Sequence, residues 1–179
     1  MQITEEQIQE AEKLGARSIL DLLKHSSSWE EVLEYSNHSI SGYTIDWLPD
    51  EVVNNLFKSK NAQIRANIAK YTKSVEILES LSKDSSIIVL REVASNSSTD
   101  MNSLKWLLEH PNNYVREYVA GNKSISKDIM IRLSTDVKYR VRKNIALNTT
   151  SKDILVDLTN DKYLSIRNIA LERIKSFDH

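Results

Sequence analysis

The chain has 179 residues, of which 40% are hydrophobic and 27% charged, a balance that suits a folded domain or an elongated array and excludes a disordered chain. Its 3 Gly and 2 Pro are too few for a turn-rich β-sandwich or a glycine-loop nucleotide fold, and the lack of Cys excludes disulfides and thiolate sites. Residues 1–48 carry a net charge of −6 and residues 49–179 one of +5, so the two parts either steer a charged partner or neutralise each other.

The first residues, MQITEEQIQE, are acidic and lack the order of a secretion signal, and no apolar run approaches the roughly 18 residues of a membrane span. We therefore expect a cytoplasmic protein with no membrane partner. The capping-box sequences TEEQ at Thr4 and SWEE at Ser28 predict helices near 4–24 and 28–36. We interpret residues 1–48 as an N-terminal helical cap that covers the repeats described next.

One phrase recurs in residues 49–179. Its copies are IRANIA (64–69), VLREVA (89–94), VREYVA (115–120), VRKNIA (141–146) and IRNIAL (166–171). Within each unit the apolar residues lie three and four apart, which is the spacing of one helix face. Each unit is therefore predicted to be two short helices. A helix pair of this size cannot bury its apolar face alone, and successive units must stack.

Two columns of apolar residues support this stacking. The small-residue column has steps of 25 or 26 and consists of Ala69, Ala94, Ala120, Ala146 and then Leu171. The leucine column has the same steps and consists of Leu56, Leu81, Leu107, Leu133 and Leu158. Both columns are predicted to lie in the core, the first of them where two helices approach closely.

Polar residues mark the helix ends. Hydroxyl side chains that can cap the first helix of a unit are Ser74, Thr99, Ser126 and Ser151. Residues at the expected start of the second helix are Asp84, His110, Asp136 and Asp161. Residues expected to end the second helix in the left-handed conformation are Asn96, Asn122 and Asn148.

The pattern D…VRxxVAxN…S/T…L..L…D at a period of 25 to 26 resembles the variant leucine-rich repeat and, more broadly, the HEAT-like group of paired-helix repeats. The resemblance covers residues 49–179, about five units, and implies an all-α, right-handed α-α solenoid. Ordinary leucine-rich repeats carry a strand phrase that is missing here, and tetratricopeptide and ankyrin units are longer. Two copies depart from the pattern: VLREVA has Leu90 in place of arginine, and in IRNIAL the alanine role falls to Leu171.

An arginine column accompanies the repeats and consists of Arg65, Arg116, Arg142 and Arg167, with Arg91 one place late. It is either a phosphate-binding ladder or a set of internal ion pairs with the acids of neighbouring units, as related repeats imply. We favour ion pairs because a guanidinium binds a carboxylate in bidentate fashion, which suits a repeated interior contact.

No catalytic constellation is evident. The histidines, His25, His38, His110 and His179, are widely separated, and none has a second ligand at the spacing of a helical metal site. The G-x-S-x-G, HExxH and phosphate-cradling glycine motifs are missing. We therefore expect no catalytic residue, metal site or cofactor, and a protein that is not an enzyme.

Surface residues of the second helices are the candidates for binding. If Val115, Val119 and Ala120 face inward, Tyr114 and Tyr118 face solvent. Tyrosine and arginine are enriched in interface hot spots because they combine contact area with a polar tip. The predicted partner-binding residues are Tyr114, Tyr118, Tyr139, Arg140, Lys143 and Tyr163. The tryptophans Trp47 and Trp106 are predicted to be core or capping aromatics.

The sequence thus predicts a scaffold that binds a protein partner through the second-helix face. One alternative is a nucleic-acid-binding protein related to the HEAT-like alkylation-repeat DNA glycosylases, since a +5 repeat region could follow phosphates. Two observations oppose this alternative. The repeat region mixes 16 acidic with its 21 basic residues, and the catalytic aromatic and carboxylate residues of that family cannot be placed in this sequence. A further alternative is a small inhibitor or immunity-type protein that occludes an enzyme.

Overall fold

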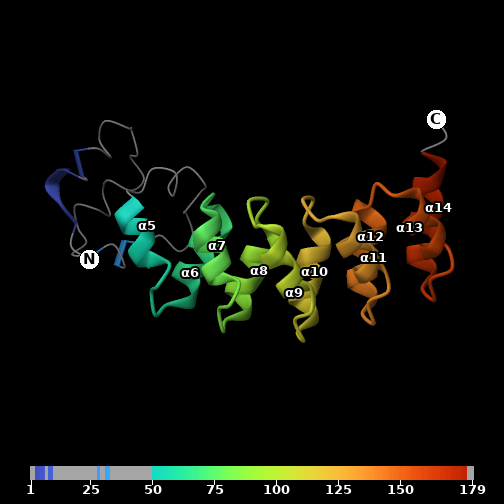
Figure 1. Cartoon of the computed structure of the whole chain (residues 1–179), viewed down its shortest axis with the longest axis horizontal. Helices are drawn as coiled ribbons and strands as arrows, with labels where there is room; N and C mark the ends of the chain where they lie inside the picture. Colours follow the sequence, from blue (N-terminus) through green and yellow to red (C-terminus); the bar gives the residue numbers. More distant parts are fainter. Residues whose placement is uncertain (1–2, 7, 10–27, 29–30, 33–49, 177–179) are drawn as a thin grey trace. The chain divides into compact units, whose positions relative to one another are not determined.

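A computed structural model describes residues 3–6, 8–9, 28, 31–32 and 50–176 of the chain. The chain divides into two compact units, residues 1–93 and residues 94–179, and each is described by itself. Ten α-helices lie between residues 50 and 175, and within the second unit they succeed one another in chain order (Figure 1). The predicted all-α fold of tandem helical hairpins is confirmed.

The first unit contains α5 (Asp50–Leu56), α6 (Ala62–Tyr71) and α7 (Val75–Leu81), followed by most of α8 (Ile87–Ser95). Helix α5 packs on α6, and α6 packs on α7. The odd-numbered helices are the first helices of their repeats, and the even-numbered helices are the second helices.

The second unit contains six complete helices. They are α9 (Met101–Leu108), α10 (Asn113–Gly121), α11 (Lys127–Ser134), α12 (Tyr139–Asn148), α13 (Lys152–Leu158) and α14 (Leu164–Lys175). The second helices form one layer, in which α12 packs against both α10 and α14. The first helices α9, α11 and α13 form the other layer, so this unit is a stack of two-helix layers.

The two predicted columns form the core. All members of the leucine column are buried, from Leu56 to Leu158, and so are the four alanines from Ala69 to Ala146. The last repeat differs from the prediction, because Leu171 is 49% exposed and its neighbour Ala170 is fully buried. In the other repeats of the second unit the alanine carbonyl faces the next repeat, and no further repeat follows Leu171 within the described residues.

The hydroxyl caps are confirmed at two of four positions. The Ser74 and Ser126 side chains accept hydrogen bonds from the backbone N–H groups of Ile77 and Ile129. Ser151 occupies the N-cap of α13 without such a bond. The prediction for Thr99 was wrong: Asp100 caps α9 instead, because its carboxylate reaches two free N–H groups of the first turn.

Predicted caps in residues 1–48 are described only in part. The Glu31 backbone N–H donates to the Ser28 hydroxyl at 3.2 Å, as the capping box predicts. The Ile8 N–H donates to the Thr4 carbonyl, as in a helical turn. The rest of the predicted helices at 4–24 and 28–36, and Trp47, lie outside the described residues.

The arginine column forms internal ion pairs. Arg116 donates from Nε to Asp136 Oδ2 at 2.6 Å and from Nη2 to Oδ1 at 3.1 Å, and so clamps the acid of the next repeat. Arg142 binds Asp161 in the same way, and Arg65 binds Asp84. We call these three contacts the arginine rungs, and they confirm the structural explanation of the column. The Arg167 guanidinium donates to the Asp161 carbonyl, which is the backbone contact that the column's other members make in their own repeats.

The acids had been predicted to start the second helices, but they lie in the turns before them. Helix α12 begins three residues after Asp136, whose Oδ1 accepts the Lys138 backbone N–H at 2.7 Å. His110 takes the same place with Nδ1, which accepts the Asn112 N–H. A short side chain that accepts the N–H two residues on closes a turn, and the carboxylate can do this while it binds arginine.

Two side chains of the asparagine column form hydrogen bonds to the preceding repeat. Asn122 was predicted to adopt a left-handed conformation, but its φ of −73° and ψ of 127° are extended. Its buried side chain donates to the carbonyls of Ala94 and Asn96 in the preceding repeat at 2.8 and 3.0 Å. Asn148, which lies inside α12, donates likewise to the Ala120 carbonyl. These contacts satisfy carbonyls that the ends of the preceding second helices leave free.

Candidate functional site

The N-terminal ends of three neighbouring second helices carry exposed tyrosines. Tyr114 is the second residue of α10, Tyr139 the first residue of α12, and Tyr163 the N-cap of α14. Their exposed fractions are 53%, 38% and 42%. Because α10, α12 and α14 pack side by side, the stacking of the repeats brings these rings to one edge of the second unit.

Two of these rings support each other. The ring centres of Tyr139 and Tyr163 lie 5.1 Å apart at an interplanar angle of 33°. The Arg142 guanidinium lies 5.7 Å from the Tyr163 ring centre, and the Lys162 ammonium 5.4 Å from it. Cations at such distances are attracted by the aromatic ring. Arg142 therefore interacts both with Asp161, in the buried rung, and with the exposed ring of Tyr163.

Arg140 lies between the tyrosine edge, which consists of Tyr114, Tyr139 and Tyr163, and Glu117 of the preceding repeat. A hydrogen bond with Tyr139 raises the pKa of the Arg140 guanidinium, and the charge of Glu117 on α10 raises it further. Arg140 is exposed, and among the described residues no carboxylate lies within 4 Å of it. Lys143, one turn further along α12, is half-buried.

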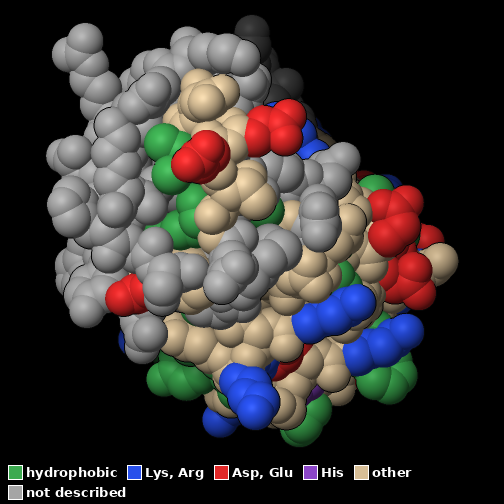
Figure 2. Space-filling view, turned by 90° about the vertical axis from the view of Figure 1, so that its left-hand side faces the viewer, with side chains coloured by type: hydrophobic (Ala, Val, Ile, Leu, Met, Phe, Trp, Pro, Cys, Tyr) green, Lys and Arg blue, Asp and Glu red, His purple; other side chains and the backbone are tan. Residues whose placement is uncertain are grey.

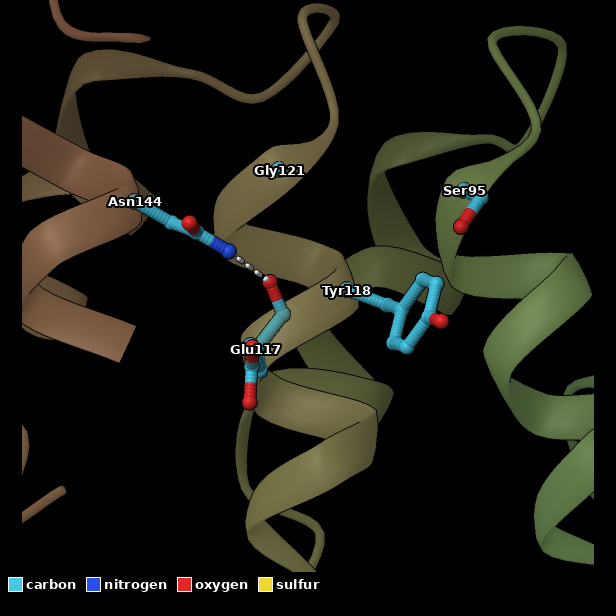
Figure 3. Close-up of a pocket in the computed structure, with 5 residues that line it drawn as sticks. All are labelled: Ser95, Glu117, Tyr118, Gly121 and Asn144. Atoms are coloured by element: carbon cyan, nitrogen blue, oxygen red, sulfur yellow. Dashed lines mark hydrogen bonds between the residues drawn. The ribbon is translucent and has the colours of Figure 1, made fainter. Parts of the chain in front are cut away.

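A pocket lies on the second-helix face of the same unit (Figure 3). Its volume is about 280 Å³, and its lining residues are Ser95, Glu117, Tyr118, Gly121 and Asn144. Asn144 Nδ2 donates to the Glu117 carbonyl at 3.0 Å, which joins α12 to α10. The Tyr118 ring projects from α10 toward Ser95, so this predicted binding residue lies in the pocket and not at the tyrosine edge.

A second hollow of about 390 Å³ lies between the turns before α12 and α14. Its lining residues are Thr135, Asp136, Val137, Arg142, Asp161 and Lys162. Val137 is 77% exposed, the highest value among the large hydrophobic side chains described. Neither Val137 nor Lys162 was among the predicted binding residues, although a valine beside a turn-closing aspartate is a visible signal in the sequence.

Trp106 was predicted to be a core or capping aromatic, but it is 64% exposed on α9. Ile131 on α11 and Val156 on α13 are exposed on the same layer of first helices. Both lie two residues before a member of the leucine column, so this spacing could have revealed an apolar stripe on that layer. We call these three residues the first-helix stripe.

Charges of both signs lie on other surfaces of the molecule. Figure 2 shows lysine or arginine side chains and acidic side chains of the described residues on one face. On the layer of first helices, Lys127 pairs with Asp153 at 3.1 Å, and Arg132 pairs with Glu109, the C-cap of α9, at 3.2 Å. The described residues contain no group of three or more His, Asp or Glu side chains that could hold a metal ion. None of their helices is both long enough and apolar enough to span a membrane.

No protein-family model matches the chain, and no curated protein matches it. Its fold is similar to a solved structure described as a leucine-rich repeat variant with a novel repetitive protein structural motif, at a TM-score of 0.59 and 22% sequence identity. The match covers 77% of this chain and 58% of that one, so the chain spans less than two thirds of that structure's length. This likeness supports the helical-repeat fold, and the residues described above carry the functional argument.

Proposed function

We propose that this chain is a non-enzymatic interaction module of the variant leucine-rich-repeat or HEAT-like kind, which binds a partner protein in the cytoplasm through the second-helix face of its second unit. The predicted residues Tyr114, Tyr118, Tyr139, Arg140, Lys143 and Tyr163 form the contact surface. Five of them lie on α10 and α12, and Tyr163 caps the adjacent α14.

The row of exposed tyrosines beside Arg140 carries this proposal. Tyr139 and Tyr163 hold each other at 5.1 Å, so part of the surface is ordered before a partner arrives. A tyrosine has few rotatable bonds, and ordering it costs little conformational entropy on binding. Exposed aromatic area and an arginine without a paired acid are the features of interface hot spots.

The phosphate-ladder explanation of the arginine column loses support. Arg65, Arg116 and Arg142 use their Nε and Nη2 atoms to bind carboxylates, and their Nη1 atoms to bind backbone carbonyls. A phosphate would have to displace the bidentate acids. Binding to nucleic acid therefore rests on other cations, and an inhibitor or immunity-type role would use the same protein-binding surface.

The test compares two faces of the same unit. The triple variant Tyr114→Ala, Tyr139→Ala, Arg140→Ala removes the proposed surface, and Trp106→Ala, Ile131→Ala, Val156→Ala removes a similar amount of exposed side chain from the first-helix stripe. We expect a partner captured by the wild-type protein to be lost with the first variant and kept with the second. Retention by the first variant, with loss by the second, would move the interface to the first helices.

A further inference from the structure

The contact between Tyr139 and Tyr163 joins the N-terminal part of α12 to the turn before α14, and we call the residues there the basic edge: Lys138, Tyr139, Arg140, Lys143, Lys162 and Tyr163. We propose that the basic edge binds an acidic segment of the partner protein, with an apolar side chain of that segment seated in the hollow beside Val137. This inference rests on the proposed function and names the chemistry of the partner.

The cations of the basic edge form no ion pair among the described residues. The two acids in the adjoining hollow are already paired, because Asp136 binds Arg116 and Asp161 binds Arg142, each at 2.6 Å. The four cations Lys138, Arg140, Lys143 and Lys162 have no carboxylate within 4 Å among the described residues. The charge of Glu117 acts on Arg140, and that of Asp161 acts on Lys162, but the four cations outnumber these acids and the surface stays net positive. Such a surface attracts carboxylates and repels a basic partner.

The hollow supplies the apolar part of the site. It measures about 390 Å³, and Val137 and Lys162 are among its lining residues. Leu164, which follows Tyr163, is 61% exposed. The remaining lining acids and Arg142 are paired in rungs, so the hollow presents neutralised polar groups, exposed hydrocarbon and one free ammonium. An aromatic or branched aliphatic side chain with a neighbouring carboxylate satisfies both kinds of surface.

A peptide fits these features better than a nucleic acid does. Proteins that bind single strands insert or stack bases on open aromatic faces. Here the rings of Tyr139 and Tyr163 contact each other, and Lys162 and Arg142 lie over the Tyr163 ring. The exposed Val137 and Leu164 offer hydrocarbon, for which a phosphate backbone has no complement.

The probe is a fluorescein-labelled peptide of glutamates around one central phenylalanine, with blocked termini, titrated with the full chain at low salt. We expect saturable binding that weakens as salt rises, because screening acts on exposed charges. A peptide with glutamines in place of glutamates should not bind. A peptide with serine in place of phenylalanine should bind more weakly than the probe.

Charge reversal tests the surface. Arg140→Glu with Lys162→Glu should weaken binding of the acidic peptide by about tenfold or more, as expected when two attractive contacts become repulsive. The matched control, Lys105→Glu with Lys123→Glu, changes net charge equally at two exposed positions away from the basic edge and should leave the affinity within about twofold of wild type. Val137→Ser should weaken binding of the phenylalanine peptide and not that of the serine peptide.

Several outcomes would overturn the inference. These are no binding of the acidic peptide at millimolar protein, equal losses in the two charge-reversal variants, or tighter binding of a dodecameric thymidine strand or a duplex than of the peptide. Self-association of the chain that the same charge reversal abolishes would assign the edge to a second copy. If the peptide fails while a captured partner still requires Tyr114, Tyr139 and Arg140, the proposed function stands and only the acidic chemistry falls.

Discussion

Arg142 and Arg140 lie two residues apart on α12, and the structure uses them in opposite ways. The Arg142 side chain is buried, clamps Asp161 and ties one repeat to the next. Arg140 points to solvent with no paired acid. Two residues correspond to roughly 200° around a helix, so one stretch supplies both the internal ladder and the basic edge. A run of basic residues therefore has to be divided by helical phase before its function is judged.

Breaking an arginine rung should have the largest effect on the free energy of unfolding. Asp161→Ala leaves the Arg142 guanidinium buried and unpaired, and we expect a loss of about 3 kcal/mol in the free energy of unfolding, measured with urea. The control is Asp153→Ala, which breaks the exposed pair with Lys127 and should cost less than about 1 kcal/mol. Equal losses in the two variants would contradict the distinction between buried and exposed pairs.

The alanine column tests the packing behind the rungs. Ala120 is fully buried, so Ala120→Leu should overpack the interface between repeats and cost about 1–3 kcal/mol of unfolding free energy. Leu171→Ala, in the same column of the last repeat, changes an exposed side chain and should cost less than about 0.5 kcal/mol. An unchanged melting temperature for Ala120→Leu would remove the column from the core.

The asparagine bridge tests the second link between repeats. Asn122→Ala removes the donor to the Ala94 and Asn96 carbonyls and should cost about 1.5 kcal/mol, since buried carbonyls lose their partner. The exposed Asn102 on α9 provides the control, and its change to Ala should be close to neutral. Urea midpoints of the two variants give the comparison.

A fall in pH should weaken the arginine rungs and leave the positive charges of the basic edge unchanged. Burial pushes the pKa of Asp161 upward, but the hydrogen bonds from Arg142 and from the Tyr163 backbone outweigh it, so that the pKa lies below its usual value. Asp84 and Asp136 are lowered by the same balance. A carboxyl whose native pKa is depressed stabilises the fold above its unfolded pKa of about 3.9, and this stabilisation is lost as the pH falls through the native pKa.

Unfolding free energy measured from pH 7 down to pH 2.5 should therefore be steady near neutrality and fall below about pH 4. Asp161→Asn should make that fall shallower, because one titrating rung is gone. A rise in stability on acidification would contradict the assignment of these three carboxylates.

The smallest effect on stability belongs to Arg140. Arg140→Gln removes an exposed charge that forms no ion pair, and we expect no measurable change in the melting temperature. Arg142→Gln, two residues away, should lower it clearly, because Asp161 is then left buried without its cation. The pair of variants separates the ladder from the basic edge in one thermal experiment.

The period of the repeat and the chemistry of its residues were sufficient to predict the helical hairpins, the two apolar columns and the arginine rungs. They were insufficient for Asn122, because an asparagine that ends a helix and one that bridges two repeats have the same place in the sequence. The prediction for Trp106 was wrong because one position along a helix turns a side chain by about 100°, in this case from the core to solvent. Only the phase relative to Leu107 distinguishes the two.

The surface was predictable in part. The exposure of Tyr114 and Tyr139 follows from the inward direction of the VRxxVA phrase, and the structure agrees. The contact between Tyr139 and Tyr163, and the hollow between Val137 and Lys162, depend on distances between successive turns that no sequence spacing determines.

The rungs impose an order on the repeats. The one repeat with Leu90 in the arginine's place is followed by the one repeat in which His110 replaces the acid, so both halves of a rung are missing together. Placing an arginine-and-acid repeat between these two would bury one guanidinium and one carboxylate without their counterparts. Recombination within this gene can therefore duplicate or delete modules only at compatible junctions, and a designer who extends the array must copy an arginine donor and its downstream acid as one cassette.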